Sequence, residues 1–253
     1  MIARERPGKG DNENQIEGRQ AVREALRSGA PVEKILVQDG CHDGPLETIR
    51  REAKKTDAVV RFVSKERLDQ LSETGRHQGV IAYVASFVYA QVDDILKRAE
   101  EKNEKPFLIL LDNVEDPHNL GAIIRTANVC GAHGVIIPKN RSARLTATVA
   151  RASAGALMHT PVAHVTNLTD TIEDLKTKGL WFVCADMDGT PMYDLDLKGP
   201  VGLVIGNEGA GVGSRVKKAC DMTASVPVHG EIESLNASVA AGVLAYEIVR
   251  QRR

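Results

Sequence analysis

Strands that are apolar at every position constrain this chain more than any other feature. Residues 107–111 read FLILL, and residues 201–205 read VGLVI. Such strands have both faces buried, which is typical of a parallel sheet covered by helices on both sides. Because segments of helical character separate them, we predict an α/β domain with a mostly parallel sheet over residues 106–253.

The predicted domain alternates between the two kinds of element. Strands are expected at 107–114, 135–138, 161–165, 180–186, 201–206 and 223–228, and helices at 119–130, 145–158, 169–179, 214–220 and 234–253. Three polar clusters follow or end strands, at the edge where open α/β sheets place their ligands.

The chain before residue 106 divides into three parts. Residues 15–89 alternate short strands with helices and predict a small α/β sandwich domain. Residues 1–14 are polar and charged, lack the apolar stretch of a secretory signal, and are expected to be a disordered tail. Residues 90–105 are dense in charge and are expected to be a partly helical linker.

The composition, with 42% hydrophobic and 26% charged residues, is that of a soluble globular protein. No apolar run reaches membrane-spanning length. The four cysteines form no C-x-x-C pair, so we expect no metal site, and they fit a cytoplasmic location. A net charge of −1 argues against a globally basic nucleic-acid binder.

Acidic residues are nevertheless unevenly distributed. No Asp or Glu occurs over residues 117–169. Buried segments avoid charges of either sign, which would explain the gap. The same span, however, keeps five basic residues, and this favours a surface that faces an anion such as a phosphate backbone. These residues are Arg125, Lys139, Arg141, Arg144 and Arg151.

The first polar cluster is DPHNLGAIIRTA, residues 116–127. Asn119 is placed to cap the helix that follows, because its side chain can accept a hydrogen bond from a backbone N–H. Arg125 lies further into the helix among apolar neighbours. It is either a surface residue with a buried stem or an anion contact.

The second cluster is the glycine-rich segment VIGNEGAGVG, residues 204–213. A phosphate-binding loop would have Lys and then Ser or Thr after its last glycine, and Val212 follows Gly211 instead. Glu208 would also repel a pyrophosphate. The loop therefore suits a ligand that is neutral or cationic at this point, unless Glu208 caps a turn and the glycines only supply positive φ angles.

The third cluster is ESLNASVAAG, residues 233–242. Ser234 is expected to be the N-cap of the last helix. Asn236 then falls in the first turn, where its amide can point at a ligand. The small residues that follow allow close packing against another backbone, and this packing is expected with or without a ligand.

Taken together and in this order, the three clusters resemble one family. The patterns N-L-G-x-x-x-R-T-A, G-x-E-G-x-G and S-L-N-x-S-V-A are similar to the motifs of the SpoU (TrmH-type) RNA 2′-O-ribose methyltransferases. In residues 15–89, EGRQAVREAL and HQGVIAYVA resemble the family's RNA-binding domain. The similarity is greatest to the branch that methylates a guanosine of 23S ribosomal RNA, the RlmB type.

The resemblance implies a fold, a cofactor and a set of site residues. It implies a C-terminal trefoil knot that binds S-adenosylmethionine, a homodimer, and RNA as the partner. The residues at the matching positions are Arg125, Glu208 and Asn236 as the catalytic set with Asn119 and Ser234 in support, Gly206, Val226 and Leu235 at the cofactor, and Lys139, Arg141 and Arg144 facing RNA.

Three questions stay open at the level of the sequence. Transfer RNA is an alternative substrate, because related enzymes share these motifs. A ribosome-assembly module that binds RNA without catalysis is an alternative function. The group that takes the proton from the ribose hydroxyl is Arg125, Glu208, water or an RNA phosphate.

Overall fold

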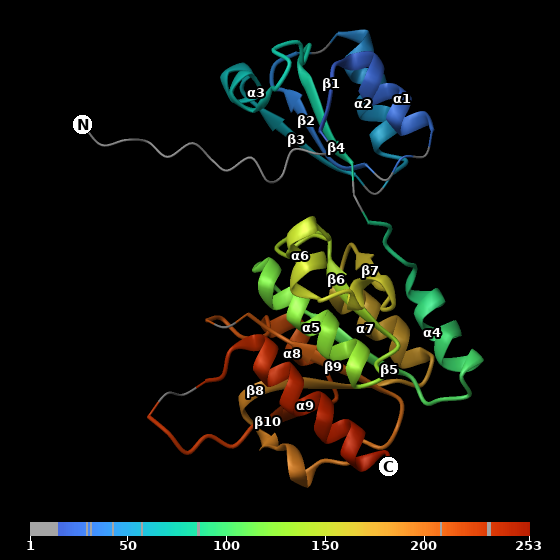
Figure 1. The fold of residues 1–253 in the computed structure, drawn as a ribbon, viewed down its shortest axis with the longest axis vertical. Helices are drawn as coiled ribbons and strands as arrows, with labels where there is room; N and C mark the ends of the chain where they lie inside the picture. Colours follow the sequence, from blue (N-terminus) through green and yellow to red (C-terminus); the bar gives the residue numbers. More distant parts are fainter. Residues whose placement is uncertain are drawn as a thin grey trace. The chain divides into compact units, whose positions relative to one another are not determined.

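The computed structural model describes residues 15–28, 30, 32–41, 43–56, 58–84, 87–207, 209–231 and 234–253. The expected tail 1–14 and the predicted site residue Glu208 lie outside these residues. The chain forms two compact units, the first reaching Val88 and the second running from Tyr89 to Arg253 (Figure 1). Each unit is described by itself.

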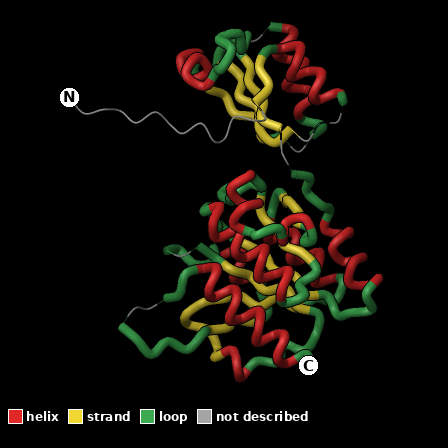
Figure 2. The backbone as a smooth tube through the Cα atoms, viewed as in Figure 1, coloured by secondary structure: helices red, strands yellow, loops and turns green. Residues whose placement is uncertain are grey.

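The first unit is a four-stranded sheet with helices on both faces (Figure 2). Successive side chains of a strand point to opposite faces. Ile35 and Val37 therefore join the core under α1 and α2, whereas Leu36 packs with Leu68 of α3 on the other face. The strands, in the order β1-β4-β2-β3, are β1 (Gln15–Glu17), β2 (Val32–Gln38), β3 (Val59–Val63) and β4 (Val80–Val84), and the helices are α1 (Arg19–Arg27), α2 (Gly44–Ala53) and α3 (Lys65–Leu71).

Glu17 ties β1 to the loop that follows α3. Its carboxylate accepts hydrogen bonds from the Ser72 and Thr74 hydroxyls and from the Glu73 backbone N–H, at 2.5–2.6 Å. Burial raises the pKa of Glu17, but these hydrogen bonds together with one from Gln15 outweigh it and lower the pKa to about 2.

The second unit contains a six-stranded sheet in which every pair of neighbouring strands is parallel. Its central strands β5 and β9 are buried at every position. The predicted fold class, α/β with a mostly parallel sheet, is confirmed. In sheet order the strands are β10 (Met222–Ser225), β8 (Trp181–Pro191), β9 (Val201–Ile205), β5 (Phe107–Leu111), β6 (Gly134–Pro138) and β7 (Val162–Val165).

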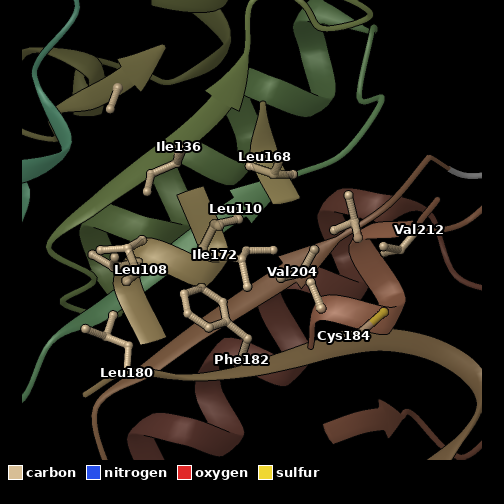
Figure 3. Close-up of a cluster of buried hydrophobic side chains, with 14 of the residues drawn as sticks. Leu108, Leu110, Ile136, Leu168, Ile172, Leu180, Phe182, Cys184, Val204 and Val212 are labelled. Atoms are coloured by element: carbon tan, nitrogen blue, oxygen red, sulfur yellow. The ribbon is translucent and has the colours of Figure 1, made fainter. Parts of the chain in front are cut away.

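Helices cover both faces of this sheet (Figure 1). On one face, Leu108 and Leu110 of β5 and Phe182 of β8 pack with Ile172 of α7 in a continuous apolar cluster (Figure 3). On the other face, α5 packs against α6 and α9. The helices are α4 (Val92–Glu101), α5 (Pro117–Val129), α6 (Ala147–Ala152), α7 (Leu168–Thr177), α8 (Ser214–Ala219) and α9 (Ala237–Gln251).

The contact between α5 and α6 explains the glycine of the N-L-G motif. A Cβ added to Gly121 would lie 2.4 Å from the Cβ of Ala152 and 2.9 Å from the carbonyl oxygen of Val149. Only glycine allows the two helix backbones to approach this closely.

Two helix predictions need correction. The expected helix 145–158 is interrupted after α6, because Ala154 and Gly155 both take positive φ angles, 49° and 87°. The last helix begins at Ala237, and its N-cap is Asn236 and not Ser234.

Segment 90–105, the expected linker, contains α4, whose Ile95 and Ala99 are buried in the second unit.

The C-terminal end of α9 is attached to the opposite edge of the sheet from the predicted site. The Arg252 guanidinium donates hydrogen bonds to the carbonyl oxygens of Lys105, Pro106 and Gly199, at the starts of β5 and β9. It also lies over the Phe107 ring.

Among the described residues, no helix is long and apolar enough to span a bilayer.

Replacing Glu17 by Gln is expected to lower the thermal unfolding midpoint of the first unit at pH 7. A carboxylate whose pKa falls on folding stabilises the folded state above its unfolded value, 4.5, and this contribution disappears as the pH drops toward 2. The difference between the variant and the wild type, followed by calorimetry, should therefore shrink between pH 5 and pH 2. Glu24→Gln in α1 is the control. A difference that stays constant with pH would contradict this role.

Candidate active site

The three motif segments meet at the carboxyl edge of the second sheet. Because its strands are parallel, the segments after β5, β9 and β10 all leave the sheet on the same side. The first motif follows β5, the glycine-rich segment follows β9, and the chain from β10 leads to the third motif at the start of α9.

The glycine-rich segment folds back tightly on itself. A Cβ added to Gly206 would lie 2.2 Å from the carbonyl carbon of Gly211 and 2.3 Å from the nitrogen of Val212. Asn207 and Gly211 exchange two backbone hydrogen bonds of 3.1 and 2.8 Å. Gly211 has a φ of 65°, so positive φ accounts for this glycine, whereas close backbone approach accounts for Gly206.

The side chain of Asn207 holds this loop in place. Its Oδ1 accepts hydrogen bonds from the N–H groups of Gly209 and Ala210, at 2.9 and 3.2 Å. Its Nδ2 donates to the carbonyl oxygen of Asn113, which follows β5. The amide therefore connects the glycine loop to the neighbouring segment of the site.

Asp112, at the end of β5, makes a second connection. The carboxylate is buried, and its Oδ2 accepts a hydrogen bond of 2.7 Å from the N–H of Gly213, 101 residues away. Gly213 is the N-cap of α8, so the carboxylate lies where the helix dipole favours negative charge.

Asn119 and Asn236 are brought into direct contact. Asn236 Nδ2 donates to Asn119 Oδ1 over 3.1 Å, and Asn236 Oδ1 caps α9 by accepting from the N–H and hydroxyl of Ser238. Asn119 is buried inside the first turn of α5. The prediction that Asn119 caps this helix is wrong, because Asp116 is the N-cap and accepts from the His118 N–H.

Arg125 is exposed on α5. It lies on the same helix as Asn119, six residues further along the chain. Glu208, the third member of the set, lies outside the described residues.

A cavity of about 350 Å³ opens beside these segments, within the range of small-molecule sites. Gly206, Val226 and Leu235, the three predicted cofactor contacts, all line it, as does Ser234. Its other walls are mainly small or apolar. They are formed by Ala185, Asp186, Met187, Ile205, Asn207, Gly209, Ala210, Gly211, Ala224, Val228, Ala237, Ala240 and Leu244.

The basic stretch 139–144 lies at the same edge of the sheet. The Ala143 N–H donates to the carbonyl oxygen of Val114, which follows β5. Arg141 is exposed and takes a positive φ of 55°, whereas Lys139 and Arg144 are half-buried. Among the described residues, no cluster of His, Cys, Asp or Glu is arranged to hold a metal ion.

Sequence reasoning missed three residues that shape this site. Asp112 and Asn207 connect its segments, and Asp186 contributes a carboxylate to the cavity wall. The sequence offered one signal for Asp112 and Asp186, because each is an acidic residue next to a buried strand segment. Lys217 lies 2.7 Å from Asp186 Oδ2, and its hydrogen bond holds the pKa of that carboxyl below its usual range.

Two family profiles match the chain. The profile of the SpoU rRNA methylase family matches residues 106–246. The profile described as RNA 2′-O ribose methyltransferase substrate binding matches residues 15–90.

Full-length relatives are similar to this chain. YacO of Bacillus subtilis (strain 168), named for the TrmH family of tRNA/rRNA methyltransferases, is 48% identical over 236 residues, covering 93% of this chain and 94% of YacO. The crystal structure of the SpoU methyltransferase AviRb from Streptomyces viridochromogenes with AdoMet has a TM-score of 0.59 and 30% identity, covering 94% of this chain and 90% of AviRb. The crystal structure of an AdoMet-bound rRNA methyltransferase from Sinorhizobium meliloti has a TM-score of 0.59 and 26% identity, covering 94% of this chain and 87% of that one.

The family resemblance carried by the three motifs is thus confirmed over both units. With its motif segments gathered around one cavity and its sequence matched from residue 15 to residue 246, the chain belongs to the SpoU (TrmH-type) methylase family.

Proposed function

We propose that this protein transfers a methyl group from S-adenosylmethionine to a ribose 2′-hydroxyl of RNA in the cytoplasm. The observation that carries the proposal is the cavity lined by Gly206, Val226 and Leu235, the last of which directly precedes Asn236 of the Asn119–Asn236 contact. These segments are far apart in the sequence and share one edge of the sheet.

The cavity has the chemistry that this cofactor needs. Bare backbone at Gly206 and Gly211 admits a flat nucleoside, and the apolar walls suit its base. The cofactor contains no phosphate, so a loop that carries Glu208 and lacks a phosphate-binding lysine is compatible with it. The bound cofactor supplies an electrophilic methyl group on a sulfonium. AviRb, whose structure contains AdoMet, supports the same ligand here.

The residues of this chain contribute mainly positioning and charge. A guanidinium stays protonated in proteins, so we assign Arg125 to hold an RNA phosphate and to stabilise the developing alkoxide. Asn119 and Asn236 hold the start of α9 against α5 and so fix one wall of the site. Glu208 enters the proposal from its motif, as the residue that orients Arg125 or accepts the proton through water.

The substrate we favour is a guanosine of 23S ribosomal RNA. The RlmB-type resemblance supports it, and the Sinorhizobium relative is an rRNA methyltransferase. Transfer RNA is the second candidate, because the name of YacO includes both RNAs. The basic stretch with Lys139, Arg141 and Arg144 would lie along the RNA.

We also propose that two copies of the chain form a dimer. Val239 and Tyr246 lie two turns apart on α9, and Val129 lies on α5, which packs against α9. These side chains are about half exposed or more, at 50%, 48% and 64%. A second copy would cover them. The trefoil knot stays a prediction of the family resemblance.

The purified protein is expected to label under-modified 23S rRNA from methyl-labelled S-adenosylmethionine, and a guanosine should carry the label. Arg125→Ala should lose at least about a hundredfold in transfer rate, the scale of a lost charge-stabilising contact, and keep its cofactor affinity. Label on tRNA alone would select the second candidate. Cofactor binding without transfer to any RNA would leave a non-catalytic role, and a large loss of cofactor affinity in Arg125→Ala would contradict its assignment.

Replacing Arg141 and Arg144 together by Ala is expected to weaken RNA binding and to flatten its salt dependence. Each lost phosphate contact lowers the slope of log K against log[salt] by about 0.7–0.9. The measurement is a titration at several salt concentrations. The matched control is Lys97→Ala/Lys102→Ala, on α4 and at its C-cap, where Asp93, Asp94, Glu100 and Glu101 are also found. An unchanged slope in the first variant would place this stretch away from the RNA.

Replacing Tyr246 by Glu is expected to convert the dimer to a monomer, because it places a charge in the apolar contact. Light scattering on the purified protein measures the mass directly. Phe62→Glu, at a 54% exposed side chain on β3 of the first unit, is the control. A dimer that survives in Tyr246→Glu, or a wild type that is monomeric, would contradict the proposed interface.

A further inference from the structure

Among the described residues that line the cavity, Asp186 is the only one with a charged side chain. It lies within β8, where the strand passes the edge of the cavity. Neither the three motifs nor the family resemblance gives it a role.

The carboxylate of Asp186 is held from two sides. Oδ2 accepts from Lys217 Nζ at 2.7 Å, and Oδ1 accepts from the Asp188 N–H at 3.1 Å. The side chain is 21% exposed. Each carboxylate oxygen has a second lone pair, so both can accept a further hydrogen bond without losing these partners.

The combined charge of Asp186 and Lys217 limits which ligand groups can bind there. Lys217 offsets the negative charge of Asp186, so a cationic ligand group would gain little from binding there. A neutral hydroxyl group, which needs an oriented acceptor and no net charge, fits better. Asn207, another polar residue of the cavity wall, already uses its amide within the protein.

The position of Asp186 separates it from the Asn119 motif. β9 lies between β8 and β5 in the sheet, and the Asn119 motif follows β5. Asp186 is therefore on the β8 side of the cavity, where it would meet a part of the ligand that does not react. Acidic residues play this part in dinucleotide sites, where a carboxylate binds the hydroxyls of a ribose.

We propose that Asp186, positioned by Lys217, accepts hydrogen bonds from the two neighbouring ribose hydroxyls of the cofactor's nucleoside. The inference rests on the proposed function, because the ligand is the cofactor named there. It adds a residue that selects a ribose over a deoxyribose at this site.

The test combines changes in the ligand with changes in the protein. Calorimetry gives the affinity of the full-length protein for S-adenosylhomocysteine and for its 2′-deoxy and 3′-deoxy forms. Loss of a hydroxyl that bonds to a charged acceptor should weaken binding to the wild type about tenfold to a hundredfold. In Asp186→Ala the ratio of the two dissociation constants, deoxy ligand to parent ligand, should fall close to one. Asp186→Asn, which keeps one acceptor oxygen, should give a ratio between those of the wild type and Asp186→Ala.

A control variant and a second ligand separate this role from a structural one. Asp93→Asn removes a carboxylate that pairs with Lys178 at 2.9 Å outside the cavity, and it should keep the full preference for hydroxyls. 5′-Methylthioadenosine, which has both hydroxyls but no amino-acid part, should bind Asp186→Ala more weakly than the wild type. The deoxy ligands on the wild type test the proposal even if the Asp186 variants are unstable.

Three results would overturn the inference. Asp186→Ala could keep the wild-type preference for hydroxyls, the deoxy ligands could bind the wild type as well as the parent ligand does, or 5′-methylthioadenosine could bind both proteins equally. The last result would assign Asp186 to the amino-acid part of the ligand. A wild type that fails to bind S-adenosylhomocysteine at all would overturn the proposed cofactor as well, so the two failures are distinguishable.

Discussion

The site depends on one backbone contact, that of Gly206 with Gly211 and Val212. A methyl group at position 206 would lie 2.2 Å from the facing backbone, so the loop closes only without a side chain there. Closure brings Asn207 to the segment after β5 and the Gly213 N–H to Asp112. The cavity wall and the start of α8 are thus positioned by the same turn.

Helix α9 connects the two edges of the sheet in the second unit. At its N-terminal end Asn236 contacts Asn119 at the carboxyl edge of the sheet, and beyond its C-terminal end Arg252 binds carbonyl groups at the amino edge. The helix spans the sheet between two polar attachments. Its packing against α5 leaves Val239 and Tyr246 exposed for the proposed second copy.

The parallel sheet was predictable because strands buried on both faces are apolar at every position, and parallel strands then place their following loops on one edge. The N-cap of α5 was not predictable in this way. Asp116 and Asn119 have similar capping propensity, and only the fold decides between them. Asp112 and Asp186 were missed because their partners, Gly213 and Lys217, are 101 and 31 residues away. Such pairs leave no local pattern in the sequence.

The contact between Asn119 and Asn236 spans 117 residues, which has a consequence for protein synthesis. A ribosome makes the first unit, the Asn119 motif and all six strands of the second sheet before it makes α9. A nascent chain can therefore fold its RNA-binding part while the cavity still lacks the wall that Leu235, Ala240 and Leu244 supply. Interrupted synthesis would then yield fragments that lack a complete methyl-donor pocket, so catalytic competence is acquired late.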